Sequence, residues 1–288
     1  MTPLRVSVLT PSYNQGRWLP DNLRSVADQD YPSIEHIVMD GGSADGSVQI
    51  LQAAPPSLIW ESTPDRGQSH AINKAFGRAT GEIIGWLNSD DAYFSRNVIA
   101  RAVDVFANHP EVGVVYGHAV LVNGAGRLLH VLWTPTFAPT LLRAYNLICQ
   151  PTVFVRRSAV QRGHLVDPAF DYQMDRELWL YLSSRTRFHR LDHILAIDRH
   201  HDERKSYTRL DLSDFDDKLL HERYKIPRLA TNPVLRRTVT AAVRMIGLSK
   251  VLQAAHGGDA LRLGGASAGA IALRQVAQLR RWMPSGDQ

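Results

Sequence analysis

The sequence has little cysteine, and it has no long uninterrupted run of apolar residues. Cys149 is the one cysteine among 288 residues, so the chain forms no internal disulfide and no cysteine-based zinc site. No stretch reaches the roughly 18 apolar residues that a membrane-spanning helix needs. Residues 1–5 have no basic region followed by an apolar stretch, so we expect no signal peptide. These absences predict a protein of the cytoplasm, either free or at the cytoplasmic face of the membrane.

An excess of charge of either sign is also absent over most of the chain, because positive and negative residues nearly balance there. The full sequence holds 33 Lys+Arg and 28 Asp+Glu, a net charge of +5, and 44% of its residues are hydrophobic. Residues 236–288 alone hold 8 Lys+Arg and 2 Asp+Glu, so the other 235 residues hold 25 and 26. A near-neutral body argues against nucleic acid as a partner. The basic C-terminal region is typical either of contact with an anionic membrane surface or of a solvated helix face.

Short apolar runs alternate with segments of helical periodicity over the first 120 residues. The apolar runs predict strands at 5–10, 36–39, 58–60, 83–87 and 112–116, and the helical segments lie at 18–29, 67–79 and 97–107. Further along, 152–155 and 188–197 have the pattern of strands and 175–184 that of a helix. This alternation is typical of an α/β fold with a mostly parallel central sheet flanked by helices. After Tyr207 the pattern becomes helical, which predicts a helical C-terminal extension.

Polar clusters follow several of the predicted strands. They occupy residues 10–14, 40–47, 61 with 65–67, and 88–91. Each cluster alone is ordinary turn or helix-cap chemistry. Because parallel strands end at the same edge of a sheet, the clusters together predict a ligand site at that edge.

Asp90 and Asp91 form the most informative of these clusters. Adjacent carboxylates after a buried strand repel each other unless a cation or a strong donor offsets their charge. Their oxygen atoms suit a hard divalent cation such as Mg²⁺ or Mn²⁺, which binds phosphate oxygens at its open positions. The alternative is a structural role as the cap of the helix that starts near Asn97.

Five segments, in order, resemble the family 2 glycosyltransferases with the A-type nucleotide-sugar fold. They are residues 8–14, 40–47, 65–74, 81–91 and 174–180, and the likeness covers about residues 4–206. The resemblance implies a catalytic domain at 1–206, with a donor half at about 1–120 and an acceptor half at about 121–206. Residues 207–288 then form a basic helical extension.

The resemblance also implies which residues bind the sugar donor. The set is Thr10, Pro11, Tyr13, Asp40, Asp65, Lys74, Asn88, Ser89 and Arg199. Within it, Asp40 corresponds to a carboxylate that contacts the base or the ribose, and Asp65 to a second nucleoside contact. Arg199 corresponds to a partner of the donor diphosphate, which suits a guanidinium group.

The sequence departs from the family at Asn88, which stands where the first carboxylate of the Asp-x-Asp motif is found. An amide can still hydrogen-bond a ribose, but it is a poorer ligand for a hard cation than a carboxylate. Asp90 or Asp91 is therefore expected to be the main metal ligand, and the sequence does not distinguish them. His201 is similar to a further metal ligand, although adjacent histidines such as His200 and His201 are also common at surfaces.

Asp175 resembles the catalytic base of the family. It opens a predicted helix, where the positive end of the helix dipole stabilises a carboxylate. Acidic residues are also common at this position without any catalytic role. Glu177 lies two residues further on and faces another direction on the helix, which makes it the weaker candidate.

Together, these residues and the resemblance imply an inverting, metal-dependent glycosyltransferase, and the inversion follows from the resemblance alone. Its expected donor is a nucleoside-diphosphate sugar based on UDP, dTDP or GDP, and its expected acceptor is a glycan or a lipid-linked hydroxyl in cell-envelope or polysaccharide biosynthesis. An alternative is a catalytically inactive nucleotide-sugar-binding protein with a regulatory or scaffold role. The basic amphipathic segment at 271–282 predicts peripheral membrane contact. The base, the sugar, the acceptor, the linkage and the oligomeric state do not follow from the sequence.

Overall fold

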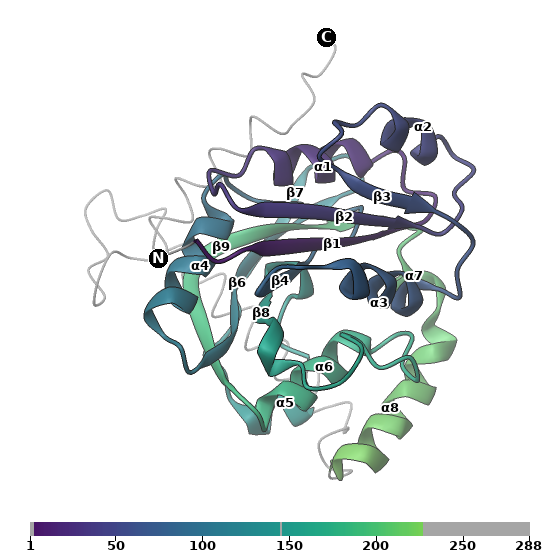
Figure 1. The fold of residues 1–288 in the computed structure, drawn as a ribbon. Coiled ribbons are helices and arrows are strands. Elements are labelled where there is room, and N and C mark those ends of the chain that lie inside the picture. The colour runs from purple at the N-terminus through teal and green to yellow at the C-terminus, as the bar shows by residue number, and fades with distance from the viewer. Residues whose placement is uncertain (1–2, 145, 227–288) are drawn as a thin grey trace, which may run out of the picture.

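One sheet forms the centre of the protein in the computed structural model, which describes residues 3–144 and 146–226 (Figure 1). Its nine strands in these residues follow the order β3-β2-β1-β4-β8-β6-β9-β5, and β7 pairs with β6 beside this path. The strands are β1 (Val6–Ser12), β2 (Ile34–Asp40), β3 (Ile59–Ser62), β4 (Ile83–Trp86), β5 (Ala92–Tyr93), β6 (Val112–Asn123), β7 (Leu128–Leu132), β8 (Phe154–Arg156) and β9 (Arg187–His200).

The α/β fold is confirmed, and the pairing of the strands shows that the sheet is mixed. The expected parallel arrangement holds for β1 to β4, where β1 pairs with β2 and β4, and β2 pairs with β3. β8 then runs antiparallel to both β4 and β6, while β6 is parallel to β9. The carboxyl ends of β1 to β4 therefore lie at one edge of the sheet, where ligands bind in folds of this class.

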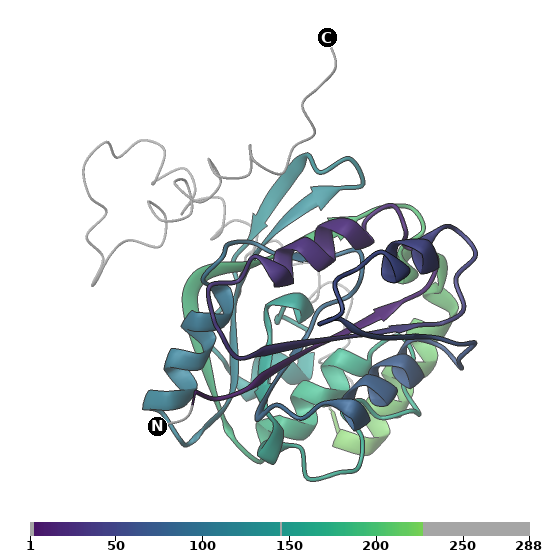
Figure 2. The same ribbon diagram turned by 45° about the horizontal axis from the view of Figure 1, so that its top comes forward.

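Helices cover both faces of the sheet. In Figures 1 and 2, α1 (Leu19–Ala27) and α2 (Ser47–Gln52) lie on one face, and α3 (Gln68–Arg78) and α6 (Met174–Ser183) lie on the other. The remaining helices are α4 (Val98–Asn108), α5 (Pro139–Ala144), α7 (Lys205–Thr208) and α8 (Leu210–Tyr224), with short 3₁₀ turns at Gln150–Thr152 and Arg157–Ala159. The helices expected near 18–29, 67–79, 97–107 and 175–184 are confirmed.

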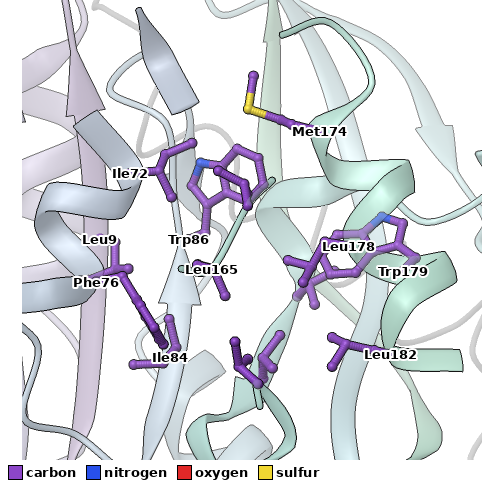
Figure 3. Packing of buried hydrophobic residues seen from close by; sticks show 14 of the residues in the cluster. Leu9, Ile72, Phe76, Ile84, Trp86, Leu165, Met174, Leu178, Trp179 and Leu182 are labelled. Carbon is purple, nitrogen blue, oxygen red and sulfur yellow. The ribbon is translucent and has the colours of Figure 1, made fainter. Parts of the chain in front are cut away.

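The hydrophobic core lies between the sheet and these helices. Side chains of a strand alternate between its two faces, and in β1 the side chain of Leu9 joins one apolar cluster while those of Val6 and Val8 join another. The first cluster contains Trp179 of α6, which is 1% exposed. Figure 3 shows the α6 residues on one side and the α3 residues on the other, with Trp86 of β4 between them. This packing fixes α6 against the sheet, and so fixes the position of the residues at the start of α6.

The predicted C-terminal extension is described only at its beginning. α7 and α8 confirm helical structure after residue 204, and residues 227–288 lie outside the described part of the chain. The basic amphipathic segment at 271–282 falls in that region, so its predicted membrane contact stays a prediction, as does the division into domains. In the described residues, none of the helices has the length and apolar character needed to cross a membrane.

Candidate functional site

Four polar segments meet at the carboxyl edge of the parallel strands. The register places Ser12 of β1 beside Asp40 of β2, and Asp40 beside Ser62 of β3. β4 lies on the other side of β1 and ends at Trp86, just before the loop at 88–91. The predicted clustering of these loops at one edge of the sheet is therefore observed.

Asp40 organises the loop that follows β2. Its side chain is 1% exposed, and its Oδ2 accepts hydrogen bonds from the backbone N–H groups of Gly42 and Ser43 and from the Ser62 hydroxyl, at 3.1, 2.9 and 2.6 Å. The Ser43 hydroxyl donates to Oδ1 at 2.5 Å. These bonds satisfy the buried carboxylate within the protein, and the predicted contact to a nucleoside stays a prediction.

Tyr13 and Asp65 approach each other across the backbone of Gly41. A Cβ atom at Gly41 would lie 3.1 Å from Asp65 Oδ2 and 3.2 Å from the Tyr13 ring, so a larger residue would push both away. Tyr13 is 63% exposed, although a ring of this size is usually covered. An exposed aromatic ring beside a carboxylate is a surface to which a nucleoside can bind by stacking and hydrogen bonding.

Thr10 and Pro11 lie within β1 and are buried. The Thr10 hydroxyl is 2.9 Å from Nε2 of His36, whose pKa burial lowers to about 3. A neutral His36 ring is therefore expected to hydrogen-bond Thr10 inside the sheet. The predicted donor contacts of Thr10 and Pro11 stay predictions.

Lys74 is held by side chains at the end of β3. Its ammonium group donates to Glu61 Oε1 at 2.9 Å and to the Thr63 hydroxyl at 2.8 Å. The hydrogen bond from Lys74, together with the nearby charge of Arg78, lowers the pKa of Glu61 to about 2. Lys74 therefore stands at the predicted edge of the sheet with its charge balanced by Glu61.

Asn88 joins three neighbouring segments through its amide. Its Oδ1 accepts hydrogen bonds from Trp86 Nε1 at 2.8 Å and from Gln68 Nε2 at 2.9 Å, and its Nδ2 donates to Gln150 Oε1 at 2.9 Å. An ionised carboxylate has no proton to donate, so an Asp at this position could not make the bond to Gln150. The departure from the Asp-x-Asp motif is thus accounted for by these contacts.

Asp90 and Asp91 differ sharply in their surroundings. Asp91 is 2% exposed and its Oδ1 accepts the backbone N–H of Arg199 at 3.0 Å. Burial raises the pKa of Asp91 well above its usual range, and the carboxylates of Asp90 and Asp198 raise it further. Asp90 is less buried, and its Oδ2 lies 3.0 Å from His201 Nε2. Because Asp90 lies beside the second candidate ligand, His201, the geometry favours Asp90 over Asp91 as the main ligand of a cation. Ser89, between Asn88 and Asp90, is buried.

Trp18 holds the His201 ring in place. The two ring centroids are 3.9 Å apart with the planes tilted by 35°, and Trp18 Nε1 donates to the carbonyl of Gly124 at 3.2 Å. A cavity of about 330 Å³ opens beside this pair and is lined by polar residues that include His200 and Glu203. His201 thus has one face fixed by Trp18 and its Nε2 directed at Asp90.

Arg199 ties β9 to the loop that carries Asp90. Its Nε donates to the backbone carbonyl of Asp90 at 3.0 Å, and its Nη2 pairs with Asp21 of α1 at 3.1 Å. The guanidinium group therefore links the loop to α1 in this structure, while the predicted contact with a diphosphate stays a prediction.

Asp175 lies in the first turn of α6 and is partly exposed. Its Oδ2 accepts a hydrogen bond from Asn146 Nδ2 at 2.6 Å, and its Oδ1 accepts the backbone N–H of Arg176 at 2.7 Å. Burial raises the pKa of Asp175 above its usual value, although these two hydrogen bonds act in the opposite direction. A carboxylate whose pKa is raised is a better proton acceptor than an ordinary surface aspartate.

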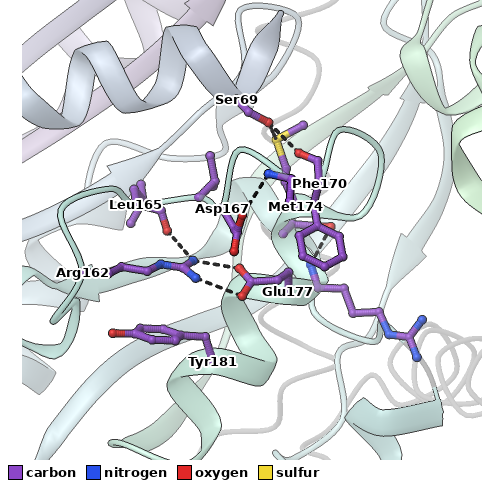
Figure 4. A network of polar contacts seen from close by, with 12 residues as sticks. Ser69, Arg162, Leu165, Asp167, Phe170, Met174, Glu177 and Tyr181 are labelled. Atoms are coloured by element: carbon purple, nitrogen blue, oxygen red, sulfur yellow. Dashed lines mark hydrogen bonds and ion pairs between the residues drawn. The ribbon is translucent and has the colours of Figure 1, made fainter. Parts of the chain in front are cut away.

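The first turn of α3 connects α6 with the Asn88 loop. Gln68 donates to Asn88, and the next residue, Ser69, donates its hydroxyl to the Phe170 carbonyl at 2.8 Å and lies 3.4 Å from Met174 Sδ (Figure 4). Met174 precedes Asp175 directly. A short chain of contacts therefore joins the segment carrying Asp175 to the segment carrying Asp90, on the same edge of the sheet.

Glu177, the weaker candidate for the base, has a different environment. It is 1% exposed and forms a two-pronged ion pair with Arg162, with N–O distances of 2.9 and 2.8 Å (Figure 4). The Tyr224 hydroxyl donates to Glu177 Oε1 at 2.6 Å. These contacts assign Glu177 to holding α6 in place.

Sequence reasoning missed several residues at the site. Gln150 and Asn146 contact Asn88 and Asp175 across more than 25 residues, and Trp18 covers His201 from the start of α1. No local motif marks these three residues, because their roles depend on contacts between distant segments. The one available signal was Trp18 itself, a bulky aromatic residue at the start of the predicted helix at 18–29.

Comparison with known proteins identifies the family. The sequence profile described as "Glycosyl transferase family 2" matches residues 7–162. The chain belongs to this family. The match covers the four parallel strands and the loops at 40–47, 65–74 and 88–91, and it ends before Asp175, whose role the profile therefore leaves untested.

Curated proteins that resemble this family 2 chain are also named as glycosyltransferases. An uncharacterized glycosyltransferase of Nostoc sp. is 28% identical over 57% of this chain and 55% of its own length. A PGL/p-HBAD biosynthesis glycosyltransferase of Mycobacterium bovis is 28% identical over 52% of this chain and 59% of its own length. The chain thus spans about half the length of these curated relatives.

Two solved structures share the fold. TarS of S. aureus in complex with UDP-GlcNAc matches with a TM-score of 0.60 and 20% identity, over 77% of this chain and 65% of that one. The mannosyltransferase PcManGT of Pyrobaculum calidifontis, in complex with GDP-Man and Mn²⁺, matches with a TM-score of 0.55 and 19% identity, over 98% of this chain and 84% of that one. At these identities the likeness establishes the fold.

Proposed function

We propose that this chain is an inverting, metal-dependent glycosyltransferase that moves a sugar from a nucleoside diphosphate to a hydroxyl acceptor. Membership of glycosyl transferase family 2 supports the reaction class. The ligands of the two structural neighbours, UDP-GlcNAc and GDP-Man, support a nucleoside-diphosphate sugar as donor. UDP, dTDP and GDP sugars are the donors to be tested.

The observation that carries the proposal is the connection between the start of α6 and the loop after β4. Asp175 follows Met174, which contacts Ser69, while the neighbouring Gln68 bonds Asn88 two residues before Asp90. These contacts support a proposal in which Asp175 is the proton acceptor and Asp90 binds the metal–diphosphate complex at one edge of the sheet. A transfer reaction needs these two elements side by side, because holding reactants in line supplies much of the rate.

Asp175 acts in this proposal as the general base. It accepts the proton of the acceptor hydroxyl as that oxygen forms a bond to the anomeric carbon, and the bond from this carbon to the nucleoside diphosphate breaks. Attack on the face opposite the leaving group inverts the anomeric centre. The hydrogen bond from Asn146 orients the carboxylate, and burial raises its pKa, which strengthens it as a base.

Asp90 and His201 fit a divalent cation. The described residues contain no group of three or more His, Cys, Asp or Glu side chains that could hold a metal by itself. A pair of ligands suffices for Mn²⁺ or Mg²⁺ when substrate phosphates and water complete the coordination. Asp90 Oδ2 and His201 Nε2 are 3.0 Å apart, and Trp18 restricts the ring. When bound, such an ion stabilises the charge on the departing diphosphate.

A binding and turnover panel tests the proposal. Thermal melting of the full chain is measured with UDP-, GDP- and dTDP-sugars, each with and without Mn²⁺, and release of the nucleoside diphosphate is followed by chromatography. A ligand that binds the folded state raises the melting temperature, so one donor class should raise it in the presence of Mn²⁺. A panel in which no sugar nucleotide changes the melting temperature or is consumed contradicts the proposal.

The alternative is an inactive nucleotide-sugar-binding protein with a regulatory or scaffold role, and the feature in its favour is Asn88, the departure from the Asp-x-Asp motif. The hydrogen bonds of Asn88 to Gln150, Trp86 and Gln68 explain in structural terms why an amide stands at this position. Its presence is therefore no evidence of lost catalysis. Donor binding without any release of nucleoside diphosphate in the panel would favour the alternative.

Attachment to a membrane surface is part of the proposal for the acceptor. The basic residues among 236–288 support a lipid-linked or cell-envelope glycan acceptor at an anionic surface. The full chain should pellet with anionic liposomes, and the triple variant Arg274→Glu, Arg280→Glu and Arg281→Glu should pellet less. Equal pelleting of the two proteins contradicts membrane attachment.

A further inference from the structure

The segment that leads into α6 is held by one buried carboxylate from α8. Oδ2 of Asp216 accepts hydrogen bonds from three consecutive backbone N–H groups, those of Asp171, Tyr172 and Gln173, at 3.1, 2.7 and 2.8 Å. Asp216 is 2% exposed. Hydrogen bonds to an ionised, buried acceptor are among the strong ones in proteins, so these three residues are fixed relative to α8.

The next residue of α8 adds a second connection. Asp217 Oδ1 accepts hydrogen bonds from Gln173 Nε2 at 2.7 Å and from Arg176 Nη1 at 3.0 Å. Arg176 is 3% exposed and also donates to Gln173 Oε1 at 2.9 Å and to the carbonyl of Arg143 at 2.7 Å. Asp175 thus lies between two anchored residues, Gln173 before it and Arg176 after it.

Gln173 is the residue before the first turn of α6, and its side chain makes no capping hydrogen bond to that turn. The usual local cap at a helix start is therefore missing. Asp216, 43 residues further along the chain, accepts the backbone N–H of Gln173 itself and so ties the start of α6 to α8. The position of Asp175 consequently depends on α8, which lies beyond the residues matched by the family profile.

We propose that Asp216 is a positioning residue that sets the place of Asp175 in the reaction. The inference rests on the proposed function, because it takes Asp175 to be the base. Asp216 is buried and hydrogen-bonded to the backbone of 171–173, so it acts on Asp175 through that segment. Its loss should displace Asp175 while the donor loops at 10–14, 40–47 and 88–91 keep their contacts.

Three variants of the full chain test the proposal. Asp216→Ala removes the acceptor, and Asp216→Asn keeps an acceptor oxygen of the same size without the charge. Asp214→Asn is the matched control, since Asp214 lies on the same helix and is exposed. Two measurements apply: hydrogen–deuterium exchange of the 171–173 amides without substrate, and the kcat and KM for hydrolysis of UDP-GlcNAc and GDP-mannose with Mn²⁺.

We expect Asp216→Ala to speed exchange of these amides by about tenfold or more, because the hydrogen bonds that protect them are lost. Its kcat should fall by about 10- to 100-fold, as for a small displacement of a catalytic group. KM and the dissociation constant of the nucleotide should stay within about twofold of the wild-type values. The exchange rates and the kcat of Asp216→Asn should lie between those of Asp216→Ala and those of the wild type. Asp214→Asn should match the wild type in all of these measurements.

Unchanged exchange at 171–173 in Asp216→Ala overturns the inference, and this measurement needs no turnover. A wild-type kcat in Asp216→Ala, alongside an inactive Asp175→Asn, overturns it while leaving the proposed base intact. Full turnover in Asp175→Asn instead refutes Asp175 as the base, and a wild-type protein that consumes no sugar nucleotide refutes the proposed function itself. If Asp216→Ala does not fold, Asp216→Asn is judged by the same criteria.

Discussion

Replacing Arg162 by methionine should destabilise the protein by about 3 kcal/mol, because it leaves the Glu177 charge buried without its main partner. The Glu177 side chain is 1% exposed and that of Arg162 13%, and the two share paired contacts at 2.9 and 2.8 Å. Breaking a buried pair by removing one partner costs about 3–5 kcal/mol. The lower end applies here, since the Tyr224 hydroxyl still donates to Glu177, and Arg223 lies 3.9 Å from it.

Urea denaturation of four proteins measures this cost: the wild type, Arg162→Met, Glu177→Gln and the double variant. The double variant should recover part of the loss, with a coupling of about 1–3 kcal/mol, because neither charge is then left alone. Arg162 and Arg185 both stack on the ring of Tyr181, but Arg185 is exposed. Arg185→Met is therefore the matched control, and it should lower the free energy of unfolding by less than about 1 kcal/mol. A loss below about 1 kcal/mol in Arg162→Met, or one equal to the control, refutes the reasoning.

Three further predictions concern the site. Asp175→Asn should lower turnover by about 10²- to 10⁴-fold with unchanged nucleotide binding in calorimetry, and a near-normal rate would exclude Asp175 as the base. Because burial raises the pKa of Asp175 and the base works only when deprotonated, kcat/KM should rise with pH through a value above the usual aspartate pKa of about 3.9. This rise should be absent from the residual activity of Asp175→Asn. Asp90→Ala and His201→Ala should each weaken Mn²⁺-dependent nucleotide binding by about 10-fold or more in calorimetry, and wild-type affinity in both would show that the metal lies elsewhere.

Local patterns were enough to predict most of the elements but not how they join. The apolar run of β1 and the helical periodicity at 67–79, which became α3, are properties of residues close in sequence, and both elements lie where they were expected. An apolar run does not reveal its direction in a sheet, so the antiparallel insertion of β8 between β4 and β6 could not be read from its residues. The same limit applies to β6, whose pairing with β9 extends it to Asn123.

The candidate site divides in the same way. Residues in the loops after the parallel strands, such as Asp40 and Asp90, were found because strand ends converge at one edge. Asn146, Gln150 and Asp216 were missed because each acts on a residue 29 to 62 positions away. A single sequence holds no sign of such pairs, since each partner alone is an ordinary polar side chain.

Asp175 and Glu177 show why residue type and spacing alone could not assign the base. Both are carboxylates in the first turn of α6, and positions two apart on a helix face different directions. The Glu177 carboxylate turns toward Arg162, whose ion pair holds its charge in a fixed place. The Asp175 carboxylate accepts hydrogen bonds from the neutral amide of Asn146 and from the backbone N–H of Arg176, and it keeps partial exposure. A base must be free to take up a proton, and among the described residues the surroundings of Asp175 suit the proposed role better than those of Glu177, whose charge is paired with Arg162.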